Sequence, residues 1–311
     1  MNTATQAREL VRAYQARTGL STGHVGRLAG VAFQTMKQFM TDCYPHQEES
    51  LARQLIQAVE ANPPQIPDVE GKLYTTENVR ILDRQIEAAR DGALSLIYGS
   101  PGTQKSFVFQ RRVAEALRRA GLEAPTVGYV YASGAMGRKA LAQEIARQFV
   151  VYPGSSAYGT LTSLVFALQR RKQRAVLIVD EAQHFGGELP LLEMLRELVD
   201  RAGVGLIVAG HDRLEQIFDP QRSPLEQFVQ RFDYRLRLPG LSEKEVRTIA
   251  AAELGQVPER TMEAVLKQSE ATDRHARASY YSARYLFKVI AQVRRRRSMK
   301  DAHNGSRKSV N

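Results

Sequence analysis

The spacing of apolar side chains divides the chain into regions with different patterns. Before residue 62, apolar residues recur at the three- and four-residue intervals typical of amphipathic helices. This pattern predicts four helices, at Ala4–Arg17, Thr22–Ala29, Ala32–Met40 and Glu48–Glu60. Three prolines then fall within Ala61–Asp68, where missing backbone donors and fixed φ angles prevent a helix or sheet from continuing. We therefore predict a small all-helical domain at 1–61 and a linker at 62–71.

Beyond the linker, short apolar runs alternate with helical patterns. Five runs are typical of buried strands: Leu94–Tyr98, Thr126–Val130, Ala175–Val179, Val204–Ala209 and Tyr234–Leu238. The helical patterns include Phe107–Ala120, Arg138–Phe149, Leu161–Arg171 and Leu189–Ala202. This alternation indicates βαβ units, and hence an α/β core at 72–240 with a parallel sheet covered on both faces.

After Pro239 only helical patterns remain. They predict helices at Ser242–Leu254, Pro258–Glu270 and Ser282–Arg297, which we group as a helical domain at 241–297. The last segment, 298–311, is rich in small, polar and basic residues, and we predict a disordered basic tail there.

Positive charge is concentrated at the end of the chain. The net charge is +11, and the eighteen residues from Arg294 onward contain seven basic and one acidic side chain. Arg294, Arg295, Arg296 and Arg297 stand in a row at the end of the last predicted helix. Such a segment binds polyanions without sequence preference, so we expect contact with nucleic acid that weakens with salt. A solubilising end, or arginines that complement a helix C-terminus, is the alternative.

Composition excludes several classes of protein. The single cysteine, Cys43, rules out an intrachain disulfide framework and a Cys-rich zinc site. C-x-x-C, H-E-x-x-H and G-x-S-x-G patterns are absent, which removes support for zinc-hydrolase and esterase mechanisms. The N-terminus lacks the features of a signal peptide, and no apolar run approaches the roughly 18 residues of a membrane span. We expect a soluble cytoplasmic protein without a membrane partner.

The strongest chemical signal follows the first strand. Gly99, Ser100, Pro101, Gly102, Thr103, Gln104, Lys105 and Ser106 match the Walker A pattern G-x-x-x-x-G-K-[ST] between a strand and a helix. In such a loop, backbone N–H groups and the helix N-terminus face phosphate oxygens. Lys105 is placed to reach the β- and γ-phosphates of ATP, and Ser106 to help hold Mg²⁺.

One position departs from this pattern. Gln104 stands where the motif has glycine, so its side chain either crowds the loop or reaches the nucleotide. The rest of the motif is intact. We therefore retain nucleotide binding and expect slower hydrolysis.

A second motif completes the predicted site. The apolar strand Val176–Val179 runs into Asp180 and Glu181, which is a Walker B pattern. We expect Asp180 to orient Mg²⁺ through water, and Glu181 to act as general base toward the attacking water. Both motifs follow the carboxyl ends of predicted strands, where ligands of open α/β sheets bind.

Together these motifs resemble the AAA+ ATPases over roughly 72–297. That resemblance implies a helical lid, ATP bound at subunit junctions, and a homo-oligomer. It also implies roles for three residues: His211 as a polar sensor after the fourth strand, Arg231 as the arginine presented to a neighbour's γ-phosphate, and Arg284 as a second sensor in the lid. A satisfied strand-end histidine and ordinary surface arginines are the alternatives, and Arg222 competes with Arg231.

The N-terminal segment from Leu20 to Met40 reads as a helix-turn-helix. Gly26 suits a close helix crossing, Gly30 suits the turn, and Val31, Met36 and Phe39 or Met40 would pack the second helix. Five side chains would then face a DNA groove: Phe33, Gln34, Thr35, Lys37 and Gln38. A small protein-binding domain is the alternative, because the net charge of residues 1–61 is only +1.

This layout resembles the family of target-selecting transposition ATPases of Mu-type phages and related transposons. The resemblance implies an ATP-dependent, largely sequence-nonspecific binder of double-stranded DNA that assembles as a ring or helical filament. It also implies delivery of target DNA to a transposase and stimulation of strand transfer. From family geometry, Arg138 and Lys139 are candidate phosphate contacts, with a solvated helix start as the alternative.

Two other functions fit the same residues. A helicase loader or replication-initiation ATPase shares the core and would need a replicative helicase as partner. A nucleotide-sensing DNA-binding regulator with weak hydrolysis is the third hypothesis, and Gln104 is the feature that favours it.

Overall fold

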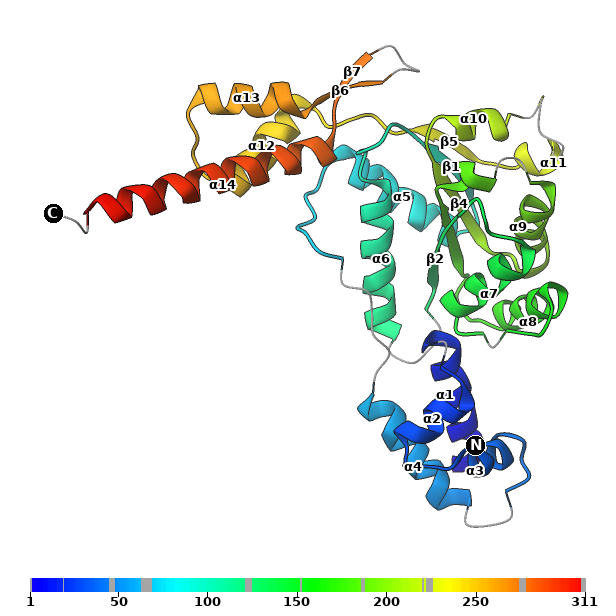
Figure 1. Cartoon of the computed structure of the whole chain (residues 1–311). Helices are drawn as coiled ribbons and strands as arrows, with labels where there is room; N and C mark the ends of the chain where they lie inside the picture. Colours follow the sequence, from blue (N-terminus) through cyan, green and yellow to red (C-terminus); the bar gives the residue numbers. More distant parts are fainter. Residues whose placement is uncertain are drawn as a thin grey trace.

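The computed structural model describes residues 2–18, 20–44, 48–62, 69–120, 125–151, 153–185, 188–219, 221, 226–273 and 278–308. Most of the predicted linker, 63–68, lies outside these residues, as does Arg222. Along the chain, a helical N-terminal domain is followed by an α/β core and a helical lid (Figure 1). The N-terminal domain lies at the end of the core that is remote from the lid, with its first helix against α7 of the core.

The N-terminal domain consists of α1 (Thr3–Thr18), α2 (Thr22–Leu28), α3 (Phe33–Met40) and α4 (Glu48–Ala61). Ser21 caps α2 by accepting from the His24 N–H, and Gly30 takes φ +66° in the turn before α3. A Cβ on Gly26 would lie 2.7 Å from Met36 Cγ, so the two short helices cross at a distance that only glycine permits. Met36 and Phe39 are fully buried, and Phe33 is exposed.

The core sheet has five parallel strands in the order β2-β3-β4-β1-β5. Their bounds are β1 (Leu94–Tyr98), β2 (Val127–Tyr131), β3 (Val176–Asp180), β4 (Gly205–Gly210) and β5 (Tyr234–Arg237). The three central strands are buried along their whole length, as expected when helices cover both faces. This order confirms the predicted α/β class and sets β1 between β4 and β5.

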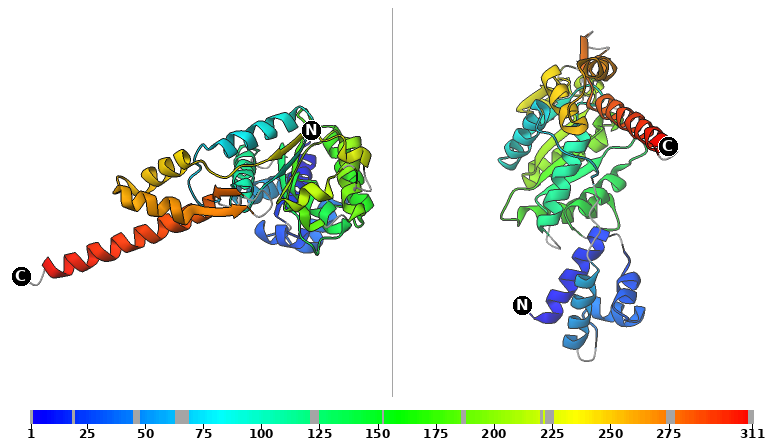
Figure 2. Two further views of the ribbon diagram at one scale, coloured as in Figure 1. Left: turned by 90° about the horizontal axis from the view of Figure 1, so that it is seen from above. Right: turned by 90° about the vertical axis from the view of Figure 1, so that its left-hand side faces the viewer.

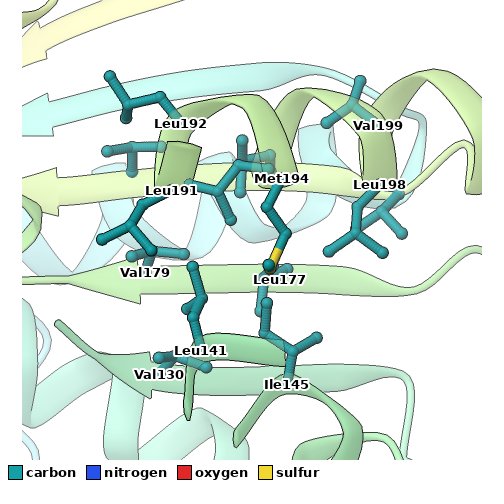
Figure 3. Close-up of a cluster of buried hydrophobic side chains, with 14 of the residues drawn as sticks. Val130, Leu141, Ile145, Leu177, Val179, Leu191, Leu192, Met194, Leu198 and Val199 are labelled. Carbon is teal, nitrogen blue, oxygen red and sulfur yellow. The ribbon is translucent and has the colours of Figure 1, made fainter. Parts of the chain in front are cut away.

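Helices form one layer on each face of the sheet. On one face lie α5 (Glu77–Arg90) and α6 (Lys105–Ala120), whose Leu82 and Phe109 pack against Ile97 and Ile178. On the other lie α7 (Arg138–Gln148), α8 (Ala157–Gln169) and α9 (Leu189–Ala202). Figure 3 shows the second core, where side chains of α7 and α9 meet Val130, Leu177 and Val179. Three short helices complete the domain: η1 (Ala182–Phe185), α10 (Arg213–Ile217) and α11 (Glu226–Val229).

The lid differs from the sequence prediction. It contains α12 (Glu243–Leu254), α13 (Glu259–Ser269) and α14 (Ala283–Lys308), as well as an antiparallel pair, β6 (Glu270–Asp273) and β7 (Ala278–Tyr281). The prediction of helices alone after Pro239 is therefore wrong. Strand β6 is short and polar, and it is stabilised by its pairing with β7, which the local sequence does not indicate.

The last helix is longer than predicted. It continues to Lys308, eleven residues beyond the predicted end at Arg297, and projects away from the lid in the two views of Figure 2. The expected disordered tail at 298–311 is thus helical through Lys308. Within the described part of the chain, no helix combines the length and apolarity that crossing a membrane requires.

Candidate nucleotide-binding site

The phosphate loop connects β1 to the first turn of α6. Lys105 lies at the start of α6 and is 7% exposed. Its Nζ donates to the Gly99 carbonyl at 2.7 Å and to Thr103 Oγ1 at 3.0 Å, so the ammonium lies inside the loop. Burial lowers the pKa of Lys105, and the nearby Asp180 and Glu181 carboxylates oppose that change. The loop thus places a buried cation where phosphate oxygens of a nucleotide can replace its internal acceptors.

Gln104 occupies the motif's glycine position in a conformation that glycine favours. Its φ is +69°, in the left-handed region that costs a residue with a side chain about 1–2 kcal/mol. Gln104 Oε1 accepts a hydrogen bond from Thr76 Oγ1 at 2.7 Å, and Thr76 also caps α5. The side chain therefore ties the loop to the start of α5, which partly offsets the backbone strain.

Because the backbone strain at Gln104 and its hydrogen bond to Thr76 have opposite effects on stability, two substitutions separate them. Gln104→Ala keeps the strained φ and removes the bond to Thr76, so we expect a loss of about 1 kcal/mol in the free energy of unfolding. Gln104→Gly removes the bond but relieves the strain, so the unfolding free energy should stay within about 1 kcal/mol of wild type. Urea unfolding of the three proteins measures this order. A glycine variant less stable than the alanine variant would contradict it.

Asp180 ends β3 and is fully buried. Its Oδ1 accepts the Glu181 N–H at 2.9 Å, and its Oδ2 accepts the Tyr129 hydroxyl at 2.9 Å. A buried carboxylate held at a strand end, whose charge acts on Lys105 of the phosphate loop, fits the oxygen ligands that Mg²⁺ prefers. The described residues contain no cluster of three or more His, Cys, Asp or Glu side chains suited to a metal. A cation here would take its remaining ligands from phosphates and water, as Mg²⁺ usually does.

Glu181 belongs to a polar network that sequence reasoning missed. Its φ is +54°, and its carboxylate accepts a short hydrogen bond from the Gln183 side-chain amide. The Oε1 of the same amide accepts the backbone N–H of His211 at 3.2 Å. Burial lowers the pKa of His211, so its imidazole is neutral at pH 7. Gln183 therefore connects the candidate base to the candidate sensor, a contact that only the fold creates.

One cavity of about 740 Å³ collects most of the predicted residues. Seven of the eight phosphate-loop residues line it, together with Glu181, His211 and Arg284; Ser100 and Asp180 are not among its lining residues. Six further lining residues were not predicted as site residues: Glu70, Gly71, Lys72, Phe107, Ala283 and Phe287. Phe107 and Phe287 give this cavity apolar surface at the junction of core and lid, which suits the base or ribose of a nucleotide.

The lid contacts the phosphate loop directly. The Ala283 N–H donates to the Gly102 carbonyl at 3.0 Å, and the Tyr280 hydroxyl donates to the Pro101 carbonyl at 2.9 Å. A Cβ on Gly102, whose φ is +91°, would lie 2.0 Å from Ser282 Oγ. The glycine is therefore needed both for the loop and for lid docking. These contacts couple the lid to the loop that holds the phosphates.

Arg231 lies away from the cavity-lining residues, between α11 and β5. Its half-exposed guanidinium pairs with Asp200 of α9, on the surface of this subunit. The position leaves it accessible to a second copy of the chain, and its role there stays a prediction.

The candidate DNA contacts fall on three separate surfaces. Gln34 and Lys37 are exposed on α3, with Thr35 and Gln38 partly buried; Arg138 and Lys139 are exposed at the start of α7. Of the four consecutive arginines 294–297 on α14, two contact the end of α12: Arg294 binds Glu253, and Arg297 donates to the Leu254 carbonyl at 2.7 Å. These two arginines thus stabilise the lid, which leaves Arg295 and Arg296 as the better-placed phosphate contacts of this run.

The strand order, the phosphate loop and the overlying helical lid define a nucleotide-binding domain of the AAA+ class. In agreement, residues 88–218 match the AAA domain family. The fold is similar to that of the ORC2 protein of Aeropyrum pernix in its ADP form, with a TM-score of 0.51, 21% identity, and coverage of 77% of this chain and 66% of that one. The same protein in ADPNP-ADP complexes gives a TM-score of 0.50.

The sequence is also similar to the DNA transposition protein B of the Mu-like prophage FluMu of Haemophilus influenzae. The two are 26% identical over 216 residues, which cover 68% of this chain and 71% of that protein. The chain thus contains a domain with the AAA+ fold and is similar in sequence to a Mu-type transposition protein B.

Proposed function

We propose that this protein is an ATP-dependent DNA-binding protein that assembles on target DNA and delivers it to a transposase, stimulating strand transfer. The observation that carries the proposal is the single cavity shared by Lys105, Glu181, His211 and Arg284, in a chain similar to a transposition protein B. Phage origin and action in the bacterial host cytoplasm are part of the same proposal.

Binding of Mg²⁺-ATP would follow from the donors around the cavity. The loop N–H groups, Lys105 and Arg284 would hold the phosphates, while Ser106 and Asp180 would orient the metal. The metal supplies charge neutralisation at the β- and γ-phosphates. Glu181 would polarise the attacking water, and its bond to Gln183 favours slow hydrolysis until the network rearranges, for example on DNA.

Assembly would complete the site. Hydrolysis develops charge on the γ-phosphate, and a cation from the neighbouring subunit stabilises it. Arg231 is our candidate for that cation, because it is half-exposed on the surface and pairs there with the exposed Asp200. ATP at the junction would then favour a homo-oligomer, either a ring or a helical filament.

DNA contact would come from surfaces that every subunit of the oligomer presents and that mostly contact DNA phosphates. Each subunit contributes Arg138 and Lys139, Arg295 and Arg296, and the exposed face of α3 as a helix-turn-helix. A single set of such contacts binds weakly, and an oligomer multiplies them along the duplex. ATP-driven assembly would therefore control affinity for DNA without selecting a sequence.

Fluorescence anisotropy with two unrelated duplexes tests this function. We expect both to bind with similar affinity in ATP, to bind at least about tenfold more weakly in ADP, and to dissociate as salt rises. Binding confined to one duplex would instead support a sequence-specific regulator. Affinity that is equal in ATP, in ADP and without nucleotide would refute ATP-controlled assembly.

A further inference from the structure

Tyr129 makes the one side-chain hydrogen bond to Asp180 found among the described residues. It lies in the middle of β2, one of the two edge strands of the core sheet, opposite Ile178 of β3. Its hydroxyl is 2.9 Å from Asp180 Oδ2 and 3.2 Å from the Gln110 side-chain amide nitrogen. Because that nitrogen can only donate, the tyrosine oxygen accepts from Gln110 and its proton points to Asp180.

Tyr129 is held in place through both its backbone and its side chain. The outward N–H of Tyr129 on the edge strand donates to Gln148 Oε1 of α7 at 3.2 Å, and the ring packs against the core beneath α6. A tyrosine hydroxyl is protonated at neutral pH, so it is a donor to Asp180. A phenylalanine would fill this space equally well, so packing alone does not explain the hydroxyl.

The contact fixes the orientation of the carboxylate. With Oδ1 held by the Glu181 N–H and Oδ2 held by Tyr129, the plane of the Asp180 carboxylate cannot rotate freely. Each oxygen keeps lone-pair capacity beyond its single bond. Mg²⁺ demands nearly ideal octahedral geometry, so a preset carboxylate matters more for it than for larger cations.

We infer that Tyr129 is a positioning residue for Mg²⁺: its hydroxyl orients Asp180 and connects that carboxylate to the helix of the phosphate loop. Gln110 lies on α6, five residues after Lys105, so the hydrogen bonds run from the loop helix through Tyr129 to Asp180. Groups that orient a metal's ligands typically contribute 10- to 100-fold to metal affinity or activity. The inference rests on the proposed binding of Mg²⁺-ATP.

Titration of MgCl₂ into the full chain with a fluorescent ATP analogue tests the inference. For Tyr129→Phe we expect the Mg²⁺ concentration at half-maximal binding to rise about tenfold or more. Affinity for the analogue in EDTA should be unchanged, because the phenol touches no part of the loop that binds phosphate. Tyr131→Phe is the matched control, since Tyr131 lies on the same strand with a side chain that is 53% exposed.

The possible outcomes separate the inference from the proposed function. A wild-type protein that binds the analogue equally with and without Mg²⁺ would refute the metal site altogether. A normal Mg²⁺ midpoint in Tyr129→Phe, beside a Mg²⁺-dependent wild type, would overturn only the role of Tyr129. Should this variant fold poorly by thermal unfolding, Gln110→Leu removes the amide that orients the hydroxyl. We expect from it a smaller rise of the midpoint, and an unchanged midpoint would overturn the inference.

Discussion

Replacing Lys105 with alanine should reduce ATP affinity by about 10- to 150-fold. The side chain is a buried cation whose ammonium already lies among loop acceptors, so a nucleotide gains charge-assisted bonds of about 1.5–3 kcal/mol by replacing those acceptors. Binding of a fluorescent ATP analogue measures the loss. ATP-dependent DNA binding should disappear with it, because assembly would depend on the bound phosphates.

Lys139→Ala is the matched control for this change, since Lys139 is an exposed lysine at the start of a core helix. It should leave ATP affinity unchanged. A Lys105→Ala protein that is folded by circular dichroism and binds ATP within about threefold of wild type would contradict the phosphate-loop assignment. Loss of the lysine should weaken the free energy of ATP binding by roughly 1.5–3 kcal/mol.

Replacing Glu181 with glutamine should slow ATP hydrolysis by about 10²- to 10⁴-fold while leaving ATP binding intact, because a general base contributes on that scale. The introduced amide has the same shape and its oxygen still accepts from Gln183. The protein should therefore stay ATP-bound, and its complex with DNA should persist after ATP is added once. Single-turnover hydrolysis and dissociation from labelled DNA measure the two effects.

Glu263→Gln, an exposed position on lid helix α13, is the control and should hydrolyse ATP at the wild-type rate. Normal turnover by Glu181→Gln would mean that another group activates the water. His211 would then be the first residue to examine, because it lines the same cavity.

Local patterns predicted the core of this protein well. Strands β1 and β3 carry continuous apolar runs, and each runs directly into its motif, so their type and their positions in the chain followed from the residues alone. Helix α5 was missed although its signals were present: Thr76 caps it, and Val79, Leu82 and Ile86 form its buried face. The lid hairpin had no such signal, because the sequence of β6, Glu-Ala-Thr-Asp, is polar and its pairing with β7 is tertiary.

The motifs gave the position of the site but not its internal contacts. Lys105 and Glu181 were predicted from spacing alone. Gln183 and Tyr129 were not predicted, because neither lies in a motif and both act through hydrogen bonds that depend on the folded backbone. The contacts of Arg294 and Arg297 with α12 were not predicted for the same reason, because in the sequence both residues look like members of a uniform basic run.

Negative-stain electron microscopy of the protein on an arbitrary DNA duplex, with ATP and with ADP, shows whether the nucleotide controls assembly. We expect rings or helical filaments on DNA in ATP, and their loss in ADP, because the nucleotide would join subunits through the cavity that holds Lys105 and Glu181. Isolated subunits on DNA in both nucleotides, or assemblies that form equally in ATP and in ADP, would contradict ATP-controlled assembly.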